Sequence, residues 1–157
     1  TRRLFERTRV RASGPIDHAK HAPAIRDIMG PKCFAVFDES LQVLRGLKEA
    51  GLRLGVVSDW QKGLAHICEE LGIGRYLDVV VASGDVGCQK PDPRLFEIAR
   101  EQLGIAAQEI LHVGDRDEDI EGAHAAGFSA ALLVRGGEQA GGNVPVITNL
   151  RELLSLV

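Results

Sequence analysis

Two aspartates at a four-residue spacing are the strongest candidates for metal chemistry in this chain. Asp115 follows the apolar run Ile110 to Val113, and Asp119 lies where the start of a helix would bring it back to the same space. Two carboxylates in one small volume repel each other, and a hard divalent cation such as Mg2+, which binds a few carboxylates together with water and phosphate oxygens, relieves that repulsion. Asp117 and Glu118 lie between them, and the spacing favours Asp119 as the second inward carboxylate. The alternative is a solvated acidic turn that stabilises the helix through its dipole.

A lysine and a serine could supply the groups that bind a phosphoryl oxygen. Lys90 is followed by Pro91 and Pro93, which would hold it at the head of a helix. A fixed ammonium there could offset the charge of a carboxylate and a phosphoryl group together. Ser58 follows the apolar run Leu52 to Val57, so its hydroxyl could donate to a phosphoryl oxygen. The plainer interpretations are a surface lysine in a Pro-rich turn and a serine that caps the next helix, and the cap is compatible with binding.

The elements that would position these residues alternate between helical and strand patterns. Leucines recur at helical spacing before Gly51, and Asp92 followed by Pro93 is typical of a helix start. Repeated βαβ units predict a parallel sheet covered by helices on both faces, with right-handed crossovers. Because such sheets place their chemistry at the carboxyl ends of the strands, the serine, the lysine and the aspartates should meet there. Strands are expected at 52–57, 79–82, 110–113 and 130–134, and helices at about 41–51, 60–71, 93–103, 120–126 and 150–156.

The composition indicates one soluble globular domain. The 157 residues include 19 Lys and Arg against 22 Asp and Glu, with 45% hydrophobic residues and a net charge of -3. No stretch reaches the roughly 20 apolar residues that span a bilayer, and no signal peptide is visible at the start, so a membrane protein is excluded. The three cysteines, Cys33, Cys68 and Cys88, lack the spacing of a metal site. They fit a reducing cytoplasm, which is the expected location.

Charge is spread unevenly along the chain. Residues 1–37 hold eight basic and three acidic residues, so the remainder carries a negative net charge. A basic arm could bind nucleic acid or another polyanion. We favour the alternative, in which the basic residues from Arg2 to Arg11 form the solvent-exposed face of a helix. Stacking aromatic residues and a recognisable nucleic-acid-binding fold are both absent from the sequence. Nucleic acid is therefore not an expected partner.

Three segments, taken in order, resemble the second, third and fourth motifs of the haloacid dehalogenase-like (HAD) hydrolase superfamily. They are Val56-Val57-Ser58-Asp59, Lys90-Pro91-Asp92-Pro93, and Val113-Gly114-Asp115 continuing to Asp119-Ile120-Glu121-Gly122-Ala123. The resemblance implies a Rossmann-like three-layer α/β/α fold and Mg2+-dependent hydrolysis of phosphate esters through an aspartyl-phosphate. It implies that Ser58, Asp59 and Lys90 bind the phosphoryl group and that Lys90 also steadies the nucleophile. It further implies that Asp115 and Asp119 hold Mg2+, with Asp115, like Ser58 and Lys90, a catalytic residue.

The first motif of that superfamily, which supplies the nucleophile, is not intact in this sequence. The nearest candidate is Phe34 to Ser40, where Asp38 follows an apolar run but Ser40 stands in place of a second aspartate. We favour a different assignment. Residues 1–37 would be a basic, mostly helical remnant of a cap domain or an arm, and residues 38–157 would form the HAD-like core.

A core that lacks the first-motif strand poses a physical problem. In the family this strand lies in the middle of the sheet, so its omission would expose two inner edges and a large apolar face. Residues upstream of Thr1, the segment Cys33 to Phe37, or a strand from another chain, as in a homodimer, could fill the place. We expect the first, because the chain starts at Thr1 rather than at Met.

These observations lead us to expect a Mg2+-dependent phosphatase that acts on a small phosphorylated substrate. One alternative is a HAD-like protein that binds or regulates without catalysis. A less favoured alternative is a dehalogenase or phosphonate-cleaving member of the same superfamily. The choice among the three depends on the first motif.

Overall fold

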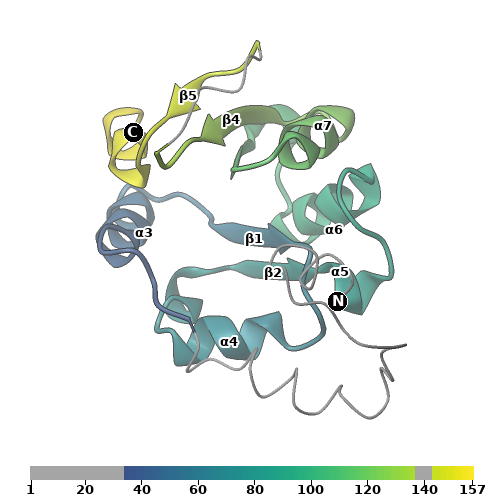
Figure 1. Ribbon diagram of the computed structural model, residues 1–157, viewed down its shortest axis with the longest axis horizontal. Helices are drawn as coiled ribbons and strands as arrows, with labels where there is room; N and C mark the ends of the chain where they lie inside the picture. The colour runs from purple at the N-terminus through teal and green to yellow at the C-terminus, as the bar shows by residue number, and fades with distance from the viewer. Residues whose placement is uncertain (1–33, 137–142) are drawn as a thin grey trace, which may run out of the picture. The chain divides into compact units, whose positions relative to one another are not determined.

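Short parallel strands alternate with helices in the computed structural model, which describes residues 34–136 and 143–157 (Figure 1). This alternation confirms the predicted α/β class. The strands are β1 (Gly55–Ser58), β2 (Val79–Ala82), β3 (Leu111–Gly114), β4 (Ser129–Leu133) and β5 (Val146–Ile147). The α-helices are α3 (Ser40–Glu49), α4 (Leu64–Glu70), α5 (Ser83–Val86), α6 (Pro93–Leu103) and α7 (Asp117–Ala125). Short 3-10 helices are η2 (Gly74–Tyr76), η3 (Ala107–Glu109) and η4 (Leu150–Ser155).

The helix α6 begins and ends where its sequence predicts. The Asp92 carboxylate accepts a hydrogen bond from the backbone N–H of Arg94, and Pro93 takes the first helical position. Gly104 ends the helix with φ of 65°, a left-handed conformation that glycine adopts without strain. Leu95 and Phe96 are fully buried, so α6 packs its apolar face into the core.

The start of the helix predicted at 60–71 is wrong, because α4 begins only at Leu64. Gly63 precedes it with φ of 93°, which interrupts a right-handed helix. The backbone of Trp60 is also engaged elsewhere: its N–H donates to the carbonyl of Ser58, and its carbonyl accepts from the N–H of Gly84. The last predicted helix, 150–156, is the 3-10 helix η4, and the two-residue strand β5 was too short to be predicted.

The predicted parallel sheet is present as two separate pieces. Strand β1 pairs in parallel with β2, from Gly55 opposite Val79 to Ser58 opposite Ala82. Strand β4 pairs in parallel with both β3 and β5. Within residues 34–136 and 143–157 no strand joins β1 to β3. Each of these two strands therefore has one edge without a partner strand among the described elements.

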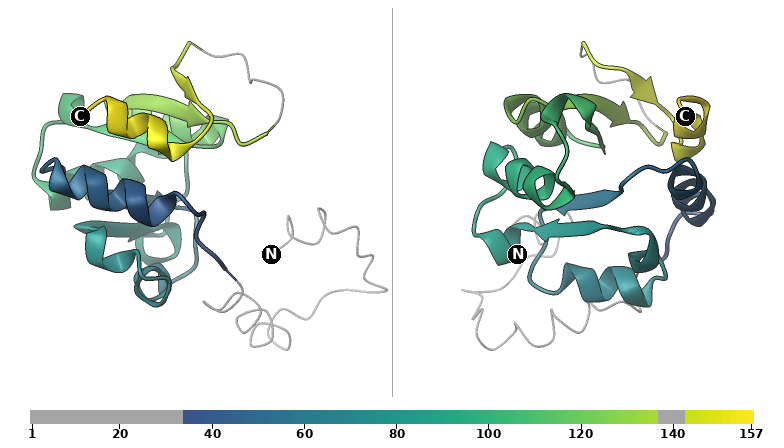
Figure 2. Two further views of the ribbon diagram at one scale, coloured as in Figure 1. Left: turned by 90° about the vertical axis from the view of Figure 1, so that its left-hand side faces the viewer. Right: turned by 180° about the vertical axis from the view of Figure 1, so that it is seen from behind.

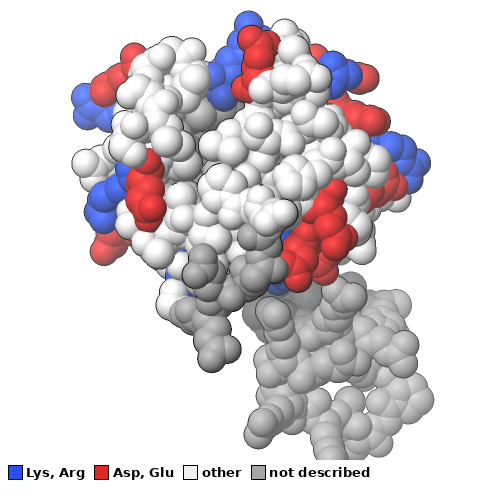
Figure 3. All heavy atoms as spheres, turned by 90° about the horizontal axis from the view of Figure 1, so that it is seen from above, with Lys and Arg blue, Asp and Glu red and all other residues white. Residues whose placement is uncertain are grey.

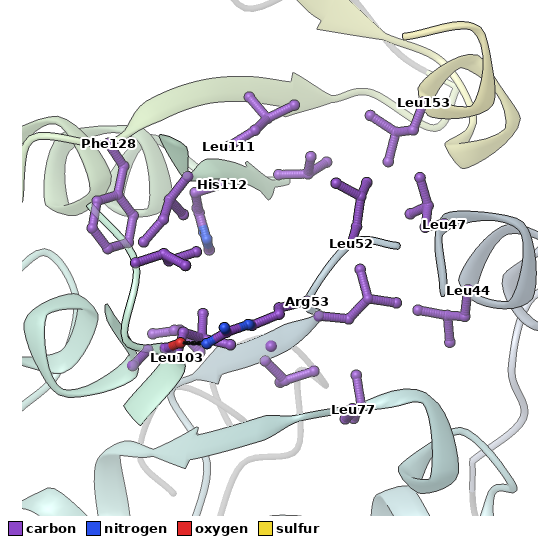
Figure 4. A pocket seen from close by; sticks show the side chains of 18 of the residues that line it. Leu44, Leu47, Leu52, Arg53, Leu77, Leu103, Leu111, His112, Phe128 and Leu153 are labelled. Atoms are coloured by element: carbon purple, nitrogen blue, oxygen red, sulfur yellow. Dashed lines mark hydrogen bonds between the residues drawn. The ribbon is translucent and has the colours of Figure 1, made fainter. Parts of the chain in front are cut away.

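A cavity of about 420 Å³ lies between these two edges. Its lining is mostly aliphatic, and Figure 4 shows Leu52 and Arg53 on one side of it and Leu111 and His112 on the other. Leu52 is 39% exposed and Leu111 is 44% exposed, although both are large apolar side chains. The expected pair of open inner edges is thus present, and the space between them is apolar.

Two helix contacts hold the half-sheets together around this cavity. Helix α6 packs on β1 and β2 and contacts α7, which packs on β3 and β4, while α3 contacts η4. Figures 1 and 2 show α6 and α7 on one side of the strands, and α3 with the C-terminal η4 on the other. A glycine lies at each contact. A Cβ at Gly122 would overlap the Phe96 ring, and a Cβ at Gly46 would come within 2.7 Å of Cδ2 of Leu154.

The segment that leads into α3 does not form the central strand. Residues 34–37 have no strand structure, so the possibility that Cys33 to Phe37 fills the central place is wrong for its described part. Phe37 is 59% exposed and lies under the guanidinium of Arg135, which is 3.9 Å from the ring centroid. Arg135 also makes a 2.5 Å ion pair with Oε1 of the buried Glu39. These contacts tie the start of α3 to the segment after β4.

Of the two predicted domains, only the core lies mainly within the described residues. Residues 35–157 form one compact unit. The predicted cap remnant, 1–37, lies outside the described residues except for 34–37.

On the face seen in Figure 3, side chains of both charge signs lie mainly around the rim, and the middle carries uncharged side chains. No helix in the described ranges is long and apolar enough to cross a membrane.

Candidate functional site

The candidate site lies at the carboxyl ends of the strands that flank the cavity. Ser58 is the last residue of β1, and Asp115 directly follows β3. Lys90 belongs to the connection between α5 and α6, and Asp119 lies in the first turn of α7. The topology therefore brings three separate segments to the edge at which sheets of this kind carry their chemistry.

Lys90 and Asp119 form a buried ion pair. Nζ of Lys90 lies 2.5 Å from Oδ1 of Asp119, and the two side chains are only 13% and 4% exposed. The same ammonium lies 3.5 Å from the carbonyl oxygen of Val57 in β1. Lys90 is therefore not the ordinary surface lysine of the plainer interpretation, because its charge is held between β1 and α7.

His112 is a second partner of Asp119. Its Nε2 lies 3.2 Å from Oδ1 of the carboxylate. The imidazole packs edge-on against Phe96, with ring centroids 5.0 Å apart and planes at 84°, and Phe96 packs in the same way on Phe128. No sequence pattern singles out His112, since a single histidine in a strand is compatible with simple packing.

The charge of Asp119 is stabilised despite its burial. Burial by itself raises the pKa of this carboxyl group, but hydrogen bonds from His112 and Lys90 and the positive charge of Lys90 outweigh it and lower the pKa to about 2. Asp119 is thus ionised at neutral pH. It is also the inward acid of its turn, because Asp117 is exposed whereas Asp119 is 3% exposed. The interpretation as a purely solvated acidic turn is wrong for Asp119.

Gly114 explains how the carboxylate fits against the strand. A Cβ at this position would overlap Cβ and Cγ of Asp119, so only glycine leaves room for the aspartate at the end of β3. The Gly-Asp pair of the sequence therefore serves two purposes. The glycine admits Asp119, and Asp115 follows it as an exposed carboxylate.

Asp59 and Ser58 lie beside the lysine. Oδ1 of Asp59 accepts a hydrogen bond of 3.0 Å from the backbone N–H of Lys90, which ties the end of β1 to the loop before α6. Ser58 is half-buried, and it does not cap the following helix, whose capping residue is Gly63. The interpretation of Ser58 as a helix cap is wrong, and its hydroxyl is not committed to that role.

The donor set at this edge matches Mg2+ in kind. Among the described residues no three His, Cys, Asp or Glu side chains come together in a group that could hold a metal ion. Mg2+, however, is usually bound through one or two carboxylates, with waters and substrate phosphate oxygens completing its shell. Asp115 is exposed, and the ionised Asp119 makes both of its polar contacts through Oδ1. Carboxylates of these two residues are ligands of the kind that Mg2+ binds, together with water and phosphate oxygens.

Comparisons with known proteins identify the family of this chain. The haloacid dehalogenase-like hydrolase family pattern matches residues 3–127. The chain is 35% identical over 113 residues to haloacid dehalogenase-like hydrolase domain-containing protein 3 of Mus musculus, covering 71% of this chain and 45% of the mouse protein. It is 35% identical over 107 residues to a glyceraldehyde 3-phosphate phosphatase of Methanopyrus kandleri, covering 64% of this chain and 44% of that enzyme.

The fold agrees with a solved structure as well. A HAD phosphatase from Thermococcus onnurineus superposes with a TM-score of 0.75 at 31% identity, covering 80% of this chain and 60% of that chain. The chain spans less than half the length of the curated relatives it matches. The match to the family pattern covers most of the chain. The chain therefore belongs to the haloacid dehalogenase-like hydrolase family.

Proposed function

We propose that this chain supplies the phosphate- and metal-binding part of a Mg2+-dependent phosphatase that acts on a small phosphate ester. The observation that carries the proposal is the Lys90–Asp119 ion pair at the carboxyl end of β1, beside the open space between β1 and β3. An aspartate at the end of a strand in that space would lie next to a fixed ammonium. Similarity to phosphatases supports the reaction class.

The reaction would proceed through a phosphorylated aspartate. The incoming aspartate attacks phosphorus in line, the bond to the ester oxygen breaks, and water then hydrolyses the aspartyl-phosphate. Lys90 would neutralise charge on the nucleophile and the phosphoryl group, and the Ser58 hydroxyl would donate to a phosphoryl oxygen. Asp59 would act at the phosphate site by holding the backbone of Lys90. Asp115 and Asp119 would hold Mg2+, which supplies charge neutralisation at the phosphoryl oxygens.

The described residues that line the cavity between β1 and β3 include one carboxylate, Glu109, and no carboxylate pair. This observation favours a second candidate function. If no acidic strand enters, the chain would be a non-catalytic HAD-like protein that binds phosphate groups. The two candidates differ in a single measurable property, which is turnover of a phosphate ester in Mg2+.

The experiment compares two lysine variants in the longest natural protein that contains this sequence. Lys90→Gln removes the buried ammonium, and Lys48→Gln removes a lysine whose ion pair with Asp78 lies on the surface. With p-nitrophenyl phosphate, glyceraldehyde 3-phosphate and 2-phosphoglycolate as probes, we expect Lys90→Gln to lower kcat/KM by about a hundredfold or more. Lys48→Gln should stay within about twofold of the wild type, because surface pairs contribute little.

The outcomes separate the candidates. An active wild type with an impaired Lys90→Gln variant supports the phosphatase. An active wild type with an unimpaired Lys90→Gln variant contradicts the role of the lysine. A wild type that turns over none of the three esters in Mg2+ favours the non-catalytic binding protein.

A further inference from the structure

We propose that His112 is a positioning residue that fixes the Asp119 carboxylate and, through it, the Lys90 ammonium. The three side chains come from β3, α7 and the loop before α6, and both partners of the carboxylate meet at one oxygen, Oδ1. The role in catalysis rests on the proposed phosphatase function. The contacts among His112, Asp119 and Lys90 are independent of that function.

The imidazole is held in place independently of Asp119. Its side chain is 13% exposed, and its ring packs edge-on against Phe96, which is fully buried. Phe96 is in turn confined by Phe128 and by Gly122, where a Cβ would overlap its ring. A histidine held by buried edge-to-face aromatic contacts gives a hydrogen bond of fixed direction, whereas a solvated side chain would not.

The protonation of the ring follows from its partner. An ionised carboxylate only accepts hydrogen bonds, so Nε2 of His112 must carry the proton that it shares with Oδ1. The neutral ring then has its proton on Nε2 and not on Nδ1. With Oδ1 held by this N–H, Asp119 cannot turn away from Lys90, and the ammonium stays at the carboxyl end of β1.

Lysine without such an anchor would sample many rotamers, since four side-chain torsions are free in solution. The His112–Asp119 contact therefore determines where the positive charge stands before any substrate binds. Preorganised charge of this kind is what makes an ammonium effective toward a developing negative charge.

The test combines two variants of His112 with a matched control. His112→Phe keeps a ring against Phe96 but removes the N–H, and His112→Gln restores a donor. His124→Phe alters an exposed histidine of α7. The direct readout is the 15N–1H signal of the Lys90 ammonium, assigned by its loss in Lys90→Gln, together with its rate of hydrogen exchange with water.

We expect exchange of the Lys90 ammonium protons to accelerate about tenfold in His112→Phe, as for the loss of a hydrogen bond to a charged group, and to return close to the wild-type rate in His112→Gln. His124→Phe should leave it unchanged. An unchanged rate in His112→Phe, or the same acceleration in both His112 variants, would overturn the proposal.

A measurement on the wild type needs no variant to fold. The 15N shifts of the histidine rings report which nitrogen is protonated, and His112 should carry its proton on Nε2. A neutral ring protonated only on Nδ1 could not donate to Asp119 and would refute the assignment.

Kinetics link the contact to the reaction. In the protein that turns over a phosphate ester, His112→Phe should lower kcat by about tenfold with KM within about twofold, and His112→Gln should recover most of kcat. If the wild type has no phosphatase activity, the proposed function fails while the two NMR measurements still decide the positioning role.

Discussion

Asp119 combines burial with a full negative charge, and its neighbours account for the combination. A carboxylate taken out of water is destabilised unless opposite charge or hydrogen-bond donors replace the lost solvent. Lys90 and His112 provide both at one oxygen, so the pKa falls to about 2 although burial alone would raise it. The ionised Asp119 carboxylate is thus stabilised by contacts that exist only in the folded state.

This dependence predicts how stability changes with pH. The folded pKa of about 2 lies below the ordinary value of 3.8, so the unfolded chain binds the proton more tightly than the folded chain does. The stabilisation is complete above about pH 4 and is lost as the pH falls through about 2, and it amounts to roughly 2 kcal/mol. Asp119→Asn should lack this component of the pH dependence.

Urea unfolding between about pH 7 and about pH 2 measures the effect as the free energy of unfolding. The difference between the wild type and Asp119→Asn should shrink on acidification. Asp117→Asn is the matched control, because Asp117 is exposed in the same helical turn. Parallel pH profiles for the wild type and Asp119→Asn would show that Asp119 has no lowered pKa.

At this scale the sequence predicted the acids better than it predicted their partners. The four-residue spacing from Asp115 favoured Asp119 as the inward acid, and the structure confirms its inward position. The sequence could not predict the role of His112, because the contact between His112 and Asp119 depends on how β3 packs against α7. Nor could it show that Asp119 would be paired with Lys90, since that distance depends on the packing of α6 against α7.

A glycine lies where helix α7 contacts α6, and another lies where α3 contacts η4. They are Gly122 and Gly46. The absence of a side chain at each glycine allows the elements to pack closely, but the side chains that face the two glycines differ in how far they can move. Phe96 is fully buried between His112 and Phe128, whereas Leu154 is only half-buried. The same substitution should therefore have unequal consequences at Gly122 and Gly46.

We expect Gly122→Ala to lower the free energy of unfolding by about 1 to 3 kcal/mol, because the new methyl group overpacks a site where the ring cannot yield. At Gly46 the Leu154 side chain can rotate away, and alanine gains up to about 1 kcal/mol of helix propensity over glycine. Gly46→Ala should therefore be near neutral. Urea denaturation of both variants tests this contrast, and equal losses at the two positions would contradict it.

Elements with strong local signals were predictable, and those set by long-range contacts were not. Asp92 and Pro93 located the start of α6, and the run Val79 to Ala82 gave β2 without error. The first turn predicted for α4 was lost because the Trp60 carbonyl accepts a hydrogen bond from the backbone N–H of Gly84, which is distant in sequence, while the Trp60 N–H donates to the carbonyl of Ser58. Such a contact leaves no periodic pattern in the sequence.

Across the whole unit the parallel sheet is interrupted between β1 and β3. The sequence predicted the parallel α/β order, and the family resemblance predicted that one central strand would be missing from it. Two edges that no strand of the described residues pairs, with an apolar cavity between them, are surfaces that favour association with another β-strand.

We therefore expect the 157-residue chain, prepared alone, to self-associate reversibly through these edges. Leu111→Lys places a charge on the open edge of β3, where Leu111 is 44% exposed, and should reduce association. Phe37→Gln is the control, because Phe37 is exposed but does not line the cavity. Sedimentation velocity over a concentration series measures the change. A wild-type chain that stays monomeric at every concentration would contradict the expectation.

The interrupted sheet also sets the order in which the proposed phosphatase could form. Strands β1 and β2 are neighbours in the chain, as are β3 and β4, so each half-sheet closes only short loops. A strand that joins β1 to β3 bridges segments that are far apart in sequence, and contacts of that kind form slowly. Helix content would thus recover early during refolding, and the proposed phosphatase activity would return in a later kinetic phase, when a strand enters between β1 and β3.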